Sequence, residues 1–236
     1  MTRFIRRHHL ILLAAAVYNA AIFYPVVFMG RVLSPNDIFF NFDPWALYKP
    51  AAITHAQNAL LNDAPTSYLT LMSLLRDHWA AFHWNPYVGS GIPGFGSSAS
   101  AVLSPFILLP ALLVPLTWVY TAIVFLKLNV PLVFGYLWLR EERLGKAGAT
   151  AGAAVMAGAG IYAVRWMWQI TNATALYPAL LWIVARSFNR RHGNVALTSV
   201  IVLAFALSGF PAAIAYGAYL CGAYALFLAI RTRSLP

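Results

Sequence analysis

The sequence predicts an all-α integral membrane protein with about six transmembrane helices and one large loop. Of its 236 residues, 61% are hydrophobic and 9% are charged, whereas a soluble domain carries about a quarter charged residues. Several separate apolar runs approach or exceed the roughly 18 residues that a helix needs to cross the hydrocarbon core. The single cysteine, Cys221, lies in such a run, which excludes a disulfide framework and a cysteine-based metal site.

The first predicted helix follows the basic N-terminal stretch "MTRFIRRHH" and runs from Leu10 to about Gly30. It is longer than the core of a signal peptide, so we expect an uncleaved helix with its N-terminus in the cytoplasm. The net charge of +10 does not indicate a nucleic-acid partner. The basic residues fall in short clusters between apolar runs and not on a polar face with aromatic residues.

Five further helices are predicted, and the fourth of these is short for a membrane span. They cover about 117–139, 147–164, 170–188, 195–209 and 212–230. Most of the remaining Lys and Arg lie in three clusters, "REERLGK" (140–146), "RSFNRRHGN" (186–194) and the terminal Arg231 and Arg233. By the positive-inside rule all three clusters belong in the cytoplasm.

This orientation leaves the segment 101–116, "AVLSPFILLPALLVPL", on the outer side as a re-entrant or interfacial piece. Its three prolines also argue against a straight spanning helix, because each removes a backbone donor. The result is one large extracytoplasmic loop over 31–116 with short helices. It contains four of the six acidic residues, namely Asp37, Asp43, Asp63 and Asp77.

Two features of the predicted helices are unusual. The small residues of "AGATAGAAVMAGAG" favour close packing against a neighbouring helix. Lys127 falls near the middle of the second predicted helix, where an unpaired ammonium is costly, so it should face protein or a water-filled cavity. A functional role and a structural pairing are both open for Lys127.

The most informative part of the loop reads "HWNPYVGSGIP" over residues 83–93. Asn85 before Pro86 favours a turn, and Gly89 and Gly91 permit a sharp bend or a close approach to a ligand. Its aromatic residues either anchor at the headgroup level or contact a ligand. The histidines and acids of the loop lack the regular spacing of a metal site.

The order of these residues resembles the YfhO-like family of bacterial membrane proteins, in the GT-C superfamily of polyprenyl-phosphate-sugar-dependent glycosyltransferases. The residues that carry the resemblance are Asp63 and Tyr68, then Trp84, Asn85, Pro86 and Tyr87, then Gly91 and Pro93, then Ser100, Ala101, Ser104 and Pro105. Later stretches, "GYLWLREERLG", "NATALYPALLW" and "LSGFPAAIAY", also resemble the family. The stretch from Trp84 to Pro93 is the specific part of the match.

The resemblance implies a GT-C-like catalytic site on the outer face. Asp63 would be the catalytic carboxylate. It would serve as general base toward the acceptor hydroxyl, or it would position a metal and a phosphate. No metal ligand is assigned, and a divalent cofactor is left open. The implied substrate-binding residues are Tyr68, Trp84, Asn85, Tyr87, Gly91, Arg165 and Lys127. Arg165, Arg76 and Arg31 are the outer-side candidates for the donor phosphate, although Arg165 also suits snorkelling to the interface.

The implied function is transfer of a sugar from a polyprenyl-phosphate donor to a cell-envelope glycopolymer or lipid, at a bacterial cytoplasmic (inner) membrane that the chain crosses several times. Membrane lipid would surround a single transmembrane module over 1–236, which is expected to be shorter than full-length relatives. Where the family often has Gln, this chain has Ser67, followed by Thr70 and Leu71. Two alternatives are a lipid-carrier transporter or flippase, suggested by Lys127, and a non-catalytic assembly subunit, suggested by these departures.

Overall fold

The computed structural model describes residues 2–79, 83–94, 101–189 and 194–232, and its regular structure there is almost entirely helical. The helices outside the segment 31–116 form a bundle. In chain order they are α1 (Thr2–Ile22), α2 (Tyr24–Met29), α6 (Val119–Glu141), α7 (Lys146–Ala157), α8 (Gly160–Arg165), α9 (Ile170–Thr174), α10 (Tyr177–Asn189), α11 (Val195–Ala206) and α12 (Pro211–Thr232). The segment 31–116 is called the loop segment below.

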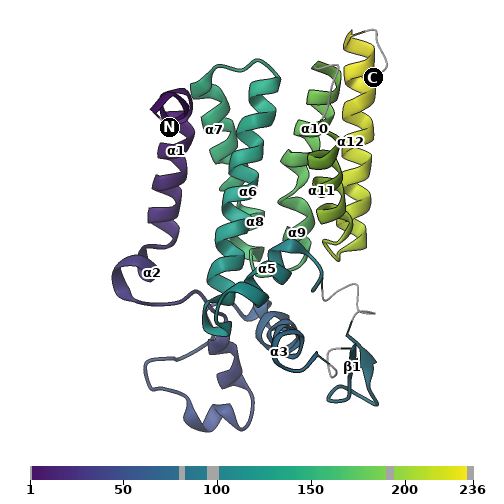
Figure 1. Cartoon of the computed structure of the whole chain (residues 1–236). Coiled ribbons are helices and arrows are strands. Elements are labelled where there is room, and N and C mark those ends of the chain that lie inside the picture. The colour runs from purple at the N-terminus through teal and green to yellow at the C-terminus, as the bar shows by residue number, and fades with distance from the viewer. Residues whose placement is uncertain (1, 80–82, 95–100, 190–193, 233–236) are drawn as a thin grey trace.

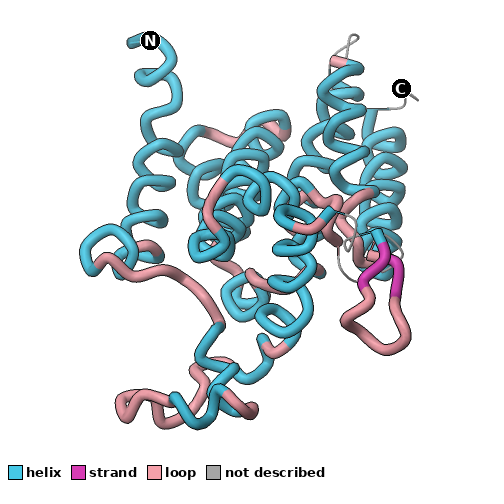
Figure 2. Tube along the Cα trace, turned by 60° about the horizontal axis from the view of Figure 1, so that its bottom comes forward, coloured by secondary structure: helices cyan, strands magenta, loops and turns pink. Residues whose placement is uncertain are grey.

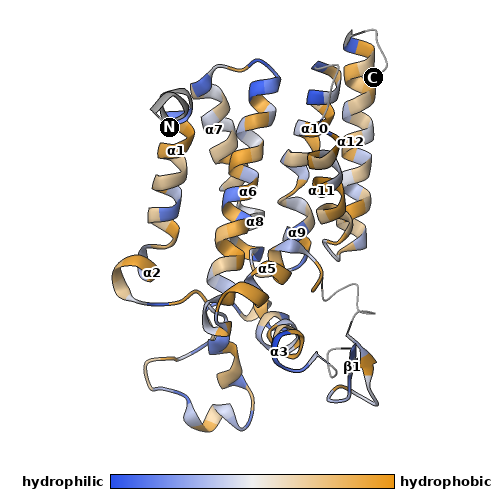
Figure 3. Cartoon of the chain, viewed as in Figure 1, coloured by the Kyte–Doolittle hydropathy of each residue, from blue (hydrophilic) through white to orange (hydrophobic). Residues whose placement is uncertain are grey.

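The two ends of the bundle differ in composition (Figure 1). The N-terminus, the α6–α7 connection and the C-terminal end of α12 lie together at one end. This end, called the basic end, carries Arg140, Arg186 and Arg231 among the described residues, and the loop segment lies at the opposite end. Most of the length of α6 and α12 is hydrophobic, whereas hydrophilic residues gather where α6 leads into α7 (Figure 3).

Within the described residues, two helices are long and apolar enough to cross a membrane, by length and composition. They comprise Leu116–Glu141, with 26 residues, and Pro211–Arg231, with 21 residues. Two shorter apolar helices, His8–Ile22 and Val195–Ala206, accompany them. The predicted all-α character is confirmed, and two of the six predicted spans are helices of sufficient length.

Three of the other predicted spans are interrupted, and the fourth, 195–209, is the continuous but short helix α11. The stretch 147–164 is divided into α7 and α8 at Gly158 and Ala159, and 170–188 is divided into α9 and α10. Proline explains two of the interruptions, because Pro25 and Pro178 are each the second residue of a new helix. A proline suits the first turn of a helix, where its missing N–H would have no partner, but it disfavours helical backbone in the residue before it.

The centre of the bundle is α6, which packs against α1, α5, α7 and α10. Its contact with α7 is made by small residues, since Ala149, Ala153 and Ala157 are completely buried. The opposing Gly135 of α6 lies so close that a Cβ there would be 3.5 Å from the Cα of Ala153. The packing role predicted for the Ala/Gly-rich stretch is therefore confirmed.

Ion pairs at the basic end join α6 to later helices. Arg186 of α10 lies 3.3 Å from Glu141, and Arg231 of α12 lies 3.0 Å from Glu142. The hydroxyl of Tyr224 donates a further hydrogen bond to Glu142. Both glutamates of the α6–α7 turn are thus used to hold separate helices together.

The loop segment contains short elements. They are the 3-10 helices η1 (Asn36–Asn41), η2 (Trp45–Tyr48), η3 (Ala59–Leu61) and η6 (Leu116–Trp118), the π-helical turn η4 (Ala64–Tyr68), the helices α3 (Leu69–Asp77) and α5 (Pro105–Leu113), and the strands β1 (Trp84–Asn85) and β2 (Ile92–Pro93). The predicted interfacial piece contains α5, whose nine residues are too few to cross a bilayer. Buried apolar side chains pack α5 against α3 and the start of α6.

The stretch 83–93 contains an antiparallel hairpin, the magenta strands and their connecting loop in Figure 2. Trp84 pairs with Pro93, and Asn85 pairs with Ile92. The side chain of Asn85 accepts a hydrogen bond of 3.0 Å from the backbone N–H of Tyr87, which closes the turn in the manner typical of asparagine. The turn predicted from Asn85 and Pro86 is confirmed.

Candidate functional site

A pocket of about 320 Å³ lies between the hairpin and the stretch that begins at Asp63. We call it the Asp63 pocket. Its walls are Asp63, Thr66, Ser67, Tyr68, Thr70 and Leu71 on one side and Asn85, Val88, Ile92, Pro93 and Gly94 on the other. Its volume lies at the lower end of the range for ligand sites, roughly 300–1,000 Å³. Tertiary structure therefore brings together two stretches that the sequence analysis singled out separately.

Asp63 directly precedes η4, but its side chain caps no backbone N–H of that turn. It is exposed to the pocket, and among the described residues its carboxylate makes no hydrogen bond or ion pair. Two other acids of the loop segment are engaged, since Asp37 accepts a hydrogen bond of 2.8 Å from Gln57 and Asp77 lies 3.7 Å from Arg76. The Asp63 carboxylate remains available to accept a proton or a ligand hydroxyl.

Three residues with hydroxyl groups line the pocket together with this carboxylate. Thr66, Ser67 and Thr70 follow Asp63 at intervals of three, four and seven residues, a spacing that is typical of one face of an α-helix. The Thr66 hydroxyl donates to Asn62 at 2.7 Å and the Thr70 hydroxyl donates to Thr66 at 3.3 Å, so their oxygen lone pairs can still accept bonds from a ligand. This helical spacing was a signal in the sequence by which the pocket hydroxyls could have been found.

Tyr68 forms the deeper part of the pocket wall and is half-buried. Burial raises the pKa of the Tyr68 hydroxyl above its usual value of 10.0, and the negative charge of Asp63 raises it further. The side-chain amide of Gln169, from the bundle, partly offsets this rise in pKa. The Tyr68 hydroxyl therefore stays protonated at neutral pH and can donate a hydrogen bond to an anionic ligand. Gln169 was not identified in the sequence analysis.

Lys127 lies outside the Asp63 pocket. Its side chain is completely buried in the bundle and donates to the carbonyl of Trp168 at 2.7 Å and to the hydroxyl of Thr171 at 3.0 Å. Trp168 lies in the turn between α8 and α9, next to Gln169, and Thr171 lies in the first turn of α9. Of the two roles left open for Lys127, the structure shows the structural pairing.

The hairpin residues contribute unequally to the pocket. Asn85 is almost completely buried and lines it, whereas Trp84 and Tyr87 are 55% and 76% exposed and lie outside it. Gly91 has a φ of +100°, and a Cβ there would be 2.5 Å from the indole Nε1 of Trp84. The glycine is required by the turn and by the Trp84 ring, and it does not line the pocket.

The predicted phosphate-binding arginines also lie elsewhere. Arg165 is exposed at the end of α8, with its guanidinium 5.4 Å from the ring centre of Trp168. Arg76 donates to the carbonyl of Val114 at 2.7 Å, and Arg31 follows the end of α2. None of the described residues lining the Asp63 pocket is a lysine or an arginine.

Metal-binding groups are sparse in the described part of the chain. No group of three or more His, Cys, Asp or Glu side chains gathers there, and Asp63 is the one carboxylate among the described residues that line the pocket. The arrangement combines a carboxylate, several hydroxyls and a protonated tyrosine. These groups suit a polyhydroxylated ligand, because each can exchange hydrogen bonds with ligand hydroxyls.

Comparison of the chain with protein families, characterised proteins and solved structures found no match.

Proposed function

We propose that the chain is a membrane glycosyltransferase of the GT-C type. It transfers a sugar from a polyprenyl-phosphate donor to a cell-envelope glycopolymer or lipid at the outer face of a bacterial cytoplasmic membrane. The observation that carries the proposal is the unpaired carboxylate of Asp63 in a pocket lined by hydroxyls and closed by the hairpin. The resemblance of the stretch from Trp84 to Pro93 to the YfhO-like family supports the same assignment.

The proposed topology has six crossings with both termini in the cytoplasm. The two long apolar helices account for two crossings. Pairs of shorter helices, α1 with α2, α7 with α8 and α9 with α10, would supply three more, and α11 the last. Interrupted helices can cross a bilayer where neighbouring helices satisfy their free backbone groups. The contact of Lys127 with the break between α8 and α9 is of this kind.

In the proposed reaction Asp63 acts as general base. The acceptor hydroxyl oxygen forms a bond to the anomeric carbon of the donor while the bond from that carbon to the phosphate oxygen breaks. Polyprenyl phosphate leaves with the bonding electrons, and the hydroxyl proton passes to Asp63. The configuration at the anomeric carbon is inverted. The Tyr68 hydroxyl is protonated at neutral pH, as a tyrosine with a pKa of 10 or above must be, and would donate a hydrogen bond to the departing phosphate.

The proposal is tested by transfer from a labelled polyprenyl-phosphate sugar in vesicles that contain the purified chain. Asp63→Asn is expected to lower the transfer rate about 100-fold or more, because the amide cannot accept the hydroxyl proton. The matched control is Asp43→Asn, which alters an exposed acid of the same loop segment away from the Asp63 pocket. We expect Asp43→Asn to retain the rate of the unmodified chain.

Transfer that persists undiminished in Asp63→Asn would remove this carboxylate from the mechanism. Movement of the carrier across the vesicle membrane without sugar transfer would favour the flippase alternative. If the chain shows no sugar transfer and no carrier movement but copurifies with a second membrane protein, the assembly-subunit alternative is favoured.

A further inference from the structure

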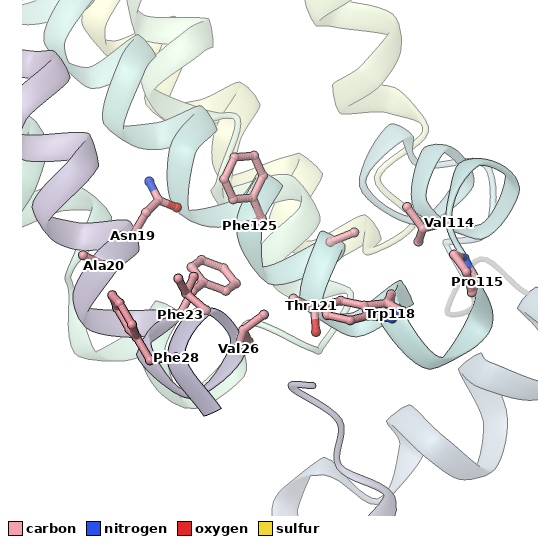
Figure 4. Close-up of a pocket in the computed structure, with 12 residues that line it drawn as sticks. Asn19, Ala20, Phe23, Val26, Phe28, Val114, Pro115, Trp118, Thr121 and Phe125 are labelled. Atoms are coloured by element: carbon pink, nitrogen blue, oxygen red, sulfur yellow. The ribbon is translucent and has the colours of Figure 1, made fainter. Parts of the chain in front are cut away.

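A second and larger cavity, an apolar groove of about 720 Å³, lies between the α1–α2 hook and the first half of α6 (Figure 4). Aromatic and aliphatic side chains make up most of its walls, with Phe23 and Phe28 on one side and Trp118 and Phe125 on the other. Phe28 and Trp118 are 67% and 41% exposed. No residue that lines the groove also lines the Asp63 pocket.

The polar side chains of the groove are already engaged. Asn19 and Asn129 exchange hydrogen bonds of 2.9 and 3.0 Å. The hydroxyl of Thr121 accepts a bond of 2.9 Å from the backbone N–H of Leu33. A ligand in the groove would therefore meet hydrocarbon almost exclusively, and a flexible alkyl chain suits such a surface better than a polar molecule.

Two arginines belong to chain segments that adjoin the groove. Arg76 donates to the carbonyl of Val114, a groove residue, at 2.7 Å. Its Nε lies 3.7 Å from the exposed carboxylate of Asp77, and the guanidinium has further N–H groups to offer. Arg31 is exposed and follows Phe28 by three residues. Two residues further on, the backbone N–H of Leu33 donates a hydrogen bond to Thr121 of the groove. The Arg31 side chain makes no hydrogen bond or ion pair among the described residues. An apolar groove with the Arg76 guanidinium at Val114 and a second arginine three residues beyond Phe28 complements a molecule with a hydrocarbon chain and an anionic head.

We propose that this groove binds an anionic phospholipid of the bilayer, with one acyl chain along α6 and the phosphate at Arg31 and Arg76. Guanidinium groups match phosphate oxygens in both charge and geometry. The volume of the groove falls within the range of ligand sites, roughly 300–1,000 Å³. This lipid is distinct from the reacting donor, and its binding does not rest on sugar transfer.

The proposed lipid would also act on the Asp63 pocket through α3. Thr70 and Leu71 in the first turns of α3 line the Asp63 pocket, and Arg76 in its last turn reaches the groove. A phosphate bound to Arg76 would tie the end of α3 to the bilayer surface. The phospholipid would then hold one wall of the pocket in place.

The test uses the full chain in nanodiscs of phosphatidylcholine with a trace of a photoactivatable phospholipid. The probe carries the same diazirine-tagged acyl chain on either a phosphatidylglycerol or a phosphatidylcholine head, and labelled peptides are identified by mass spectrometry. We expect phosphatidylglycerol to label the peptides that contain Phe23 and Trp118 more strongly than phosphatidylcholine does. Each of Arg31→Gln and Arg76→Gln is expected to reduce this preference about fivefold.

Filling the groove should abolish labelling by both probes. Ala122→Trp places a large side chain in one wall and Ala20→Trp places one in the opposite wall, and we expect either to remove the label from these peptides. The control is Val155→Trp on α7, where the native side chain is 72% exposed and lies outside the groove. Circular dichroism and gel filtration establish that each variant is folded before it is labelled.

Equal labelling by the two probes, or labelling that survives both tryptophan substitutions, would overturn the proposal. Displacement of the phosphatidylglycerol probe by an equimolar polyprenyl phosphate would also overturn it, because the groove would then belong to the carrier. Asp63→Asn is expected to leave phospholipid labelling unchanged. Loss of transfer and loss of lipid binding are therefore distinguishable.

Discussion

Glu141 and Glu142, at the basic end of the bundle, each pair with an arginine of another helix, whereas Asp63 in the loop segment faces a pocket without a partner among the described residues. In the bundle, charge holds helices together. In the loop segment, a carboxylate is left free beside hydroxyls that could meet a ligand. Charged side chains of the bundle are thus used in packing, whereas the carboxylate of Asp63 is accessible to a ligand.

Packing differs in the same way between the two regions. The contact between α6 and α7 consists of alanine and glycine residues that allow the backbones to approach closely. The hairpin instead places its large aromatic side chains on the outside, and one glycine with positive φ supports the Trp84 ring. Substitutions in the bundle should therefore change global stability, and substitutions in the hairpin should act locally. Three experiments test this contrast.

The largest effect on stability is expected for Ala153→Leu in α7. Ala153 is completely buried against Gly135 of α6, so the added carbons must separate the two helices. Overpacking of this kind costs about 3 kcal/mol of unfolding free energy. The control is Ala151→Leu on the exposed face of the same helix, which should change stability by less than about 0.5 kcal/mol. Equal unfolding temperatures in detergent for the two variants would contradict the close packing.

A local effect is expected for Gly91→Ala in the hairpin. The φ of +100° disfavours any residue with a Cβ, and the new methyl group would meet the Trp84 indole, so the local cost is about 1–3 kcal/mol. Hydrogen exchange of residues 83–94 should accelerate while exchange in α6 stays unchanged. Gly89→Ala shares the positive φ but has open space around its Cβ. If both variants accelerate exchange equally, the Trp84 contact contributes nothing.

The smallest effect is expected for Glu142→Gln at the basic end. This change weakens the ion pair with Arg231, whose side chain is 47% exposed, so solvent screening limits the loss of unfolding free energy to about 0.5–1 kcal/mol. The comparison variant is Asp77→Asn in the loop segment, whose ion pair with Arg76 is longer, at 3.7 Å, and more exposed. We expect no measurable change there. If chemical denaturation shows a larger loss of unfolding free energy for Asp77→Asn than for Glu142→Gln, ion pairs stabilise the loop segment more than the bundle, which contradicts the contrast between the two regions.

The sequence was informative about the helical, apolar character of the chain and about which segments lie at which end of the bundle. Hydropathy predicted a helical membrane protein, and the arginine clusters predicted that 140–146 and both termini lie at the end opposite the loop segment, as Figure 1 shows. It was less informative about continuity, because hydropathy averages over the breaks at Pro25, Gly158 and Pro178. These residues are apolar or neutral, and their effect on the backbone does not enter a hydropathy average.

For the candidate site, the sequence selected residues and the tertiary structure sorted them. Asp63, Tyr68 and Asn85 meet in one pocket, whereas Arg165 and Lys127 lie elsewhere. Local chemistry determined the turn at Asn85, the need for glycine at position 91 and the membrane character of the long helices. Only the fold decided that Gln169 influences the pKa of Tyr68 and that the ammonium of Lys127 meets Trp168 and Thr171. Such contacts join residues far apart in the chain, and no local pattern specifies which of them will pack together.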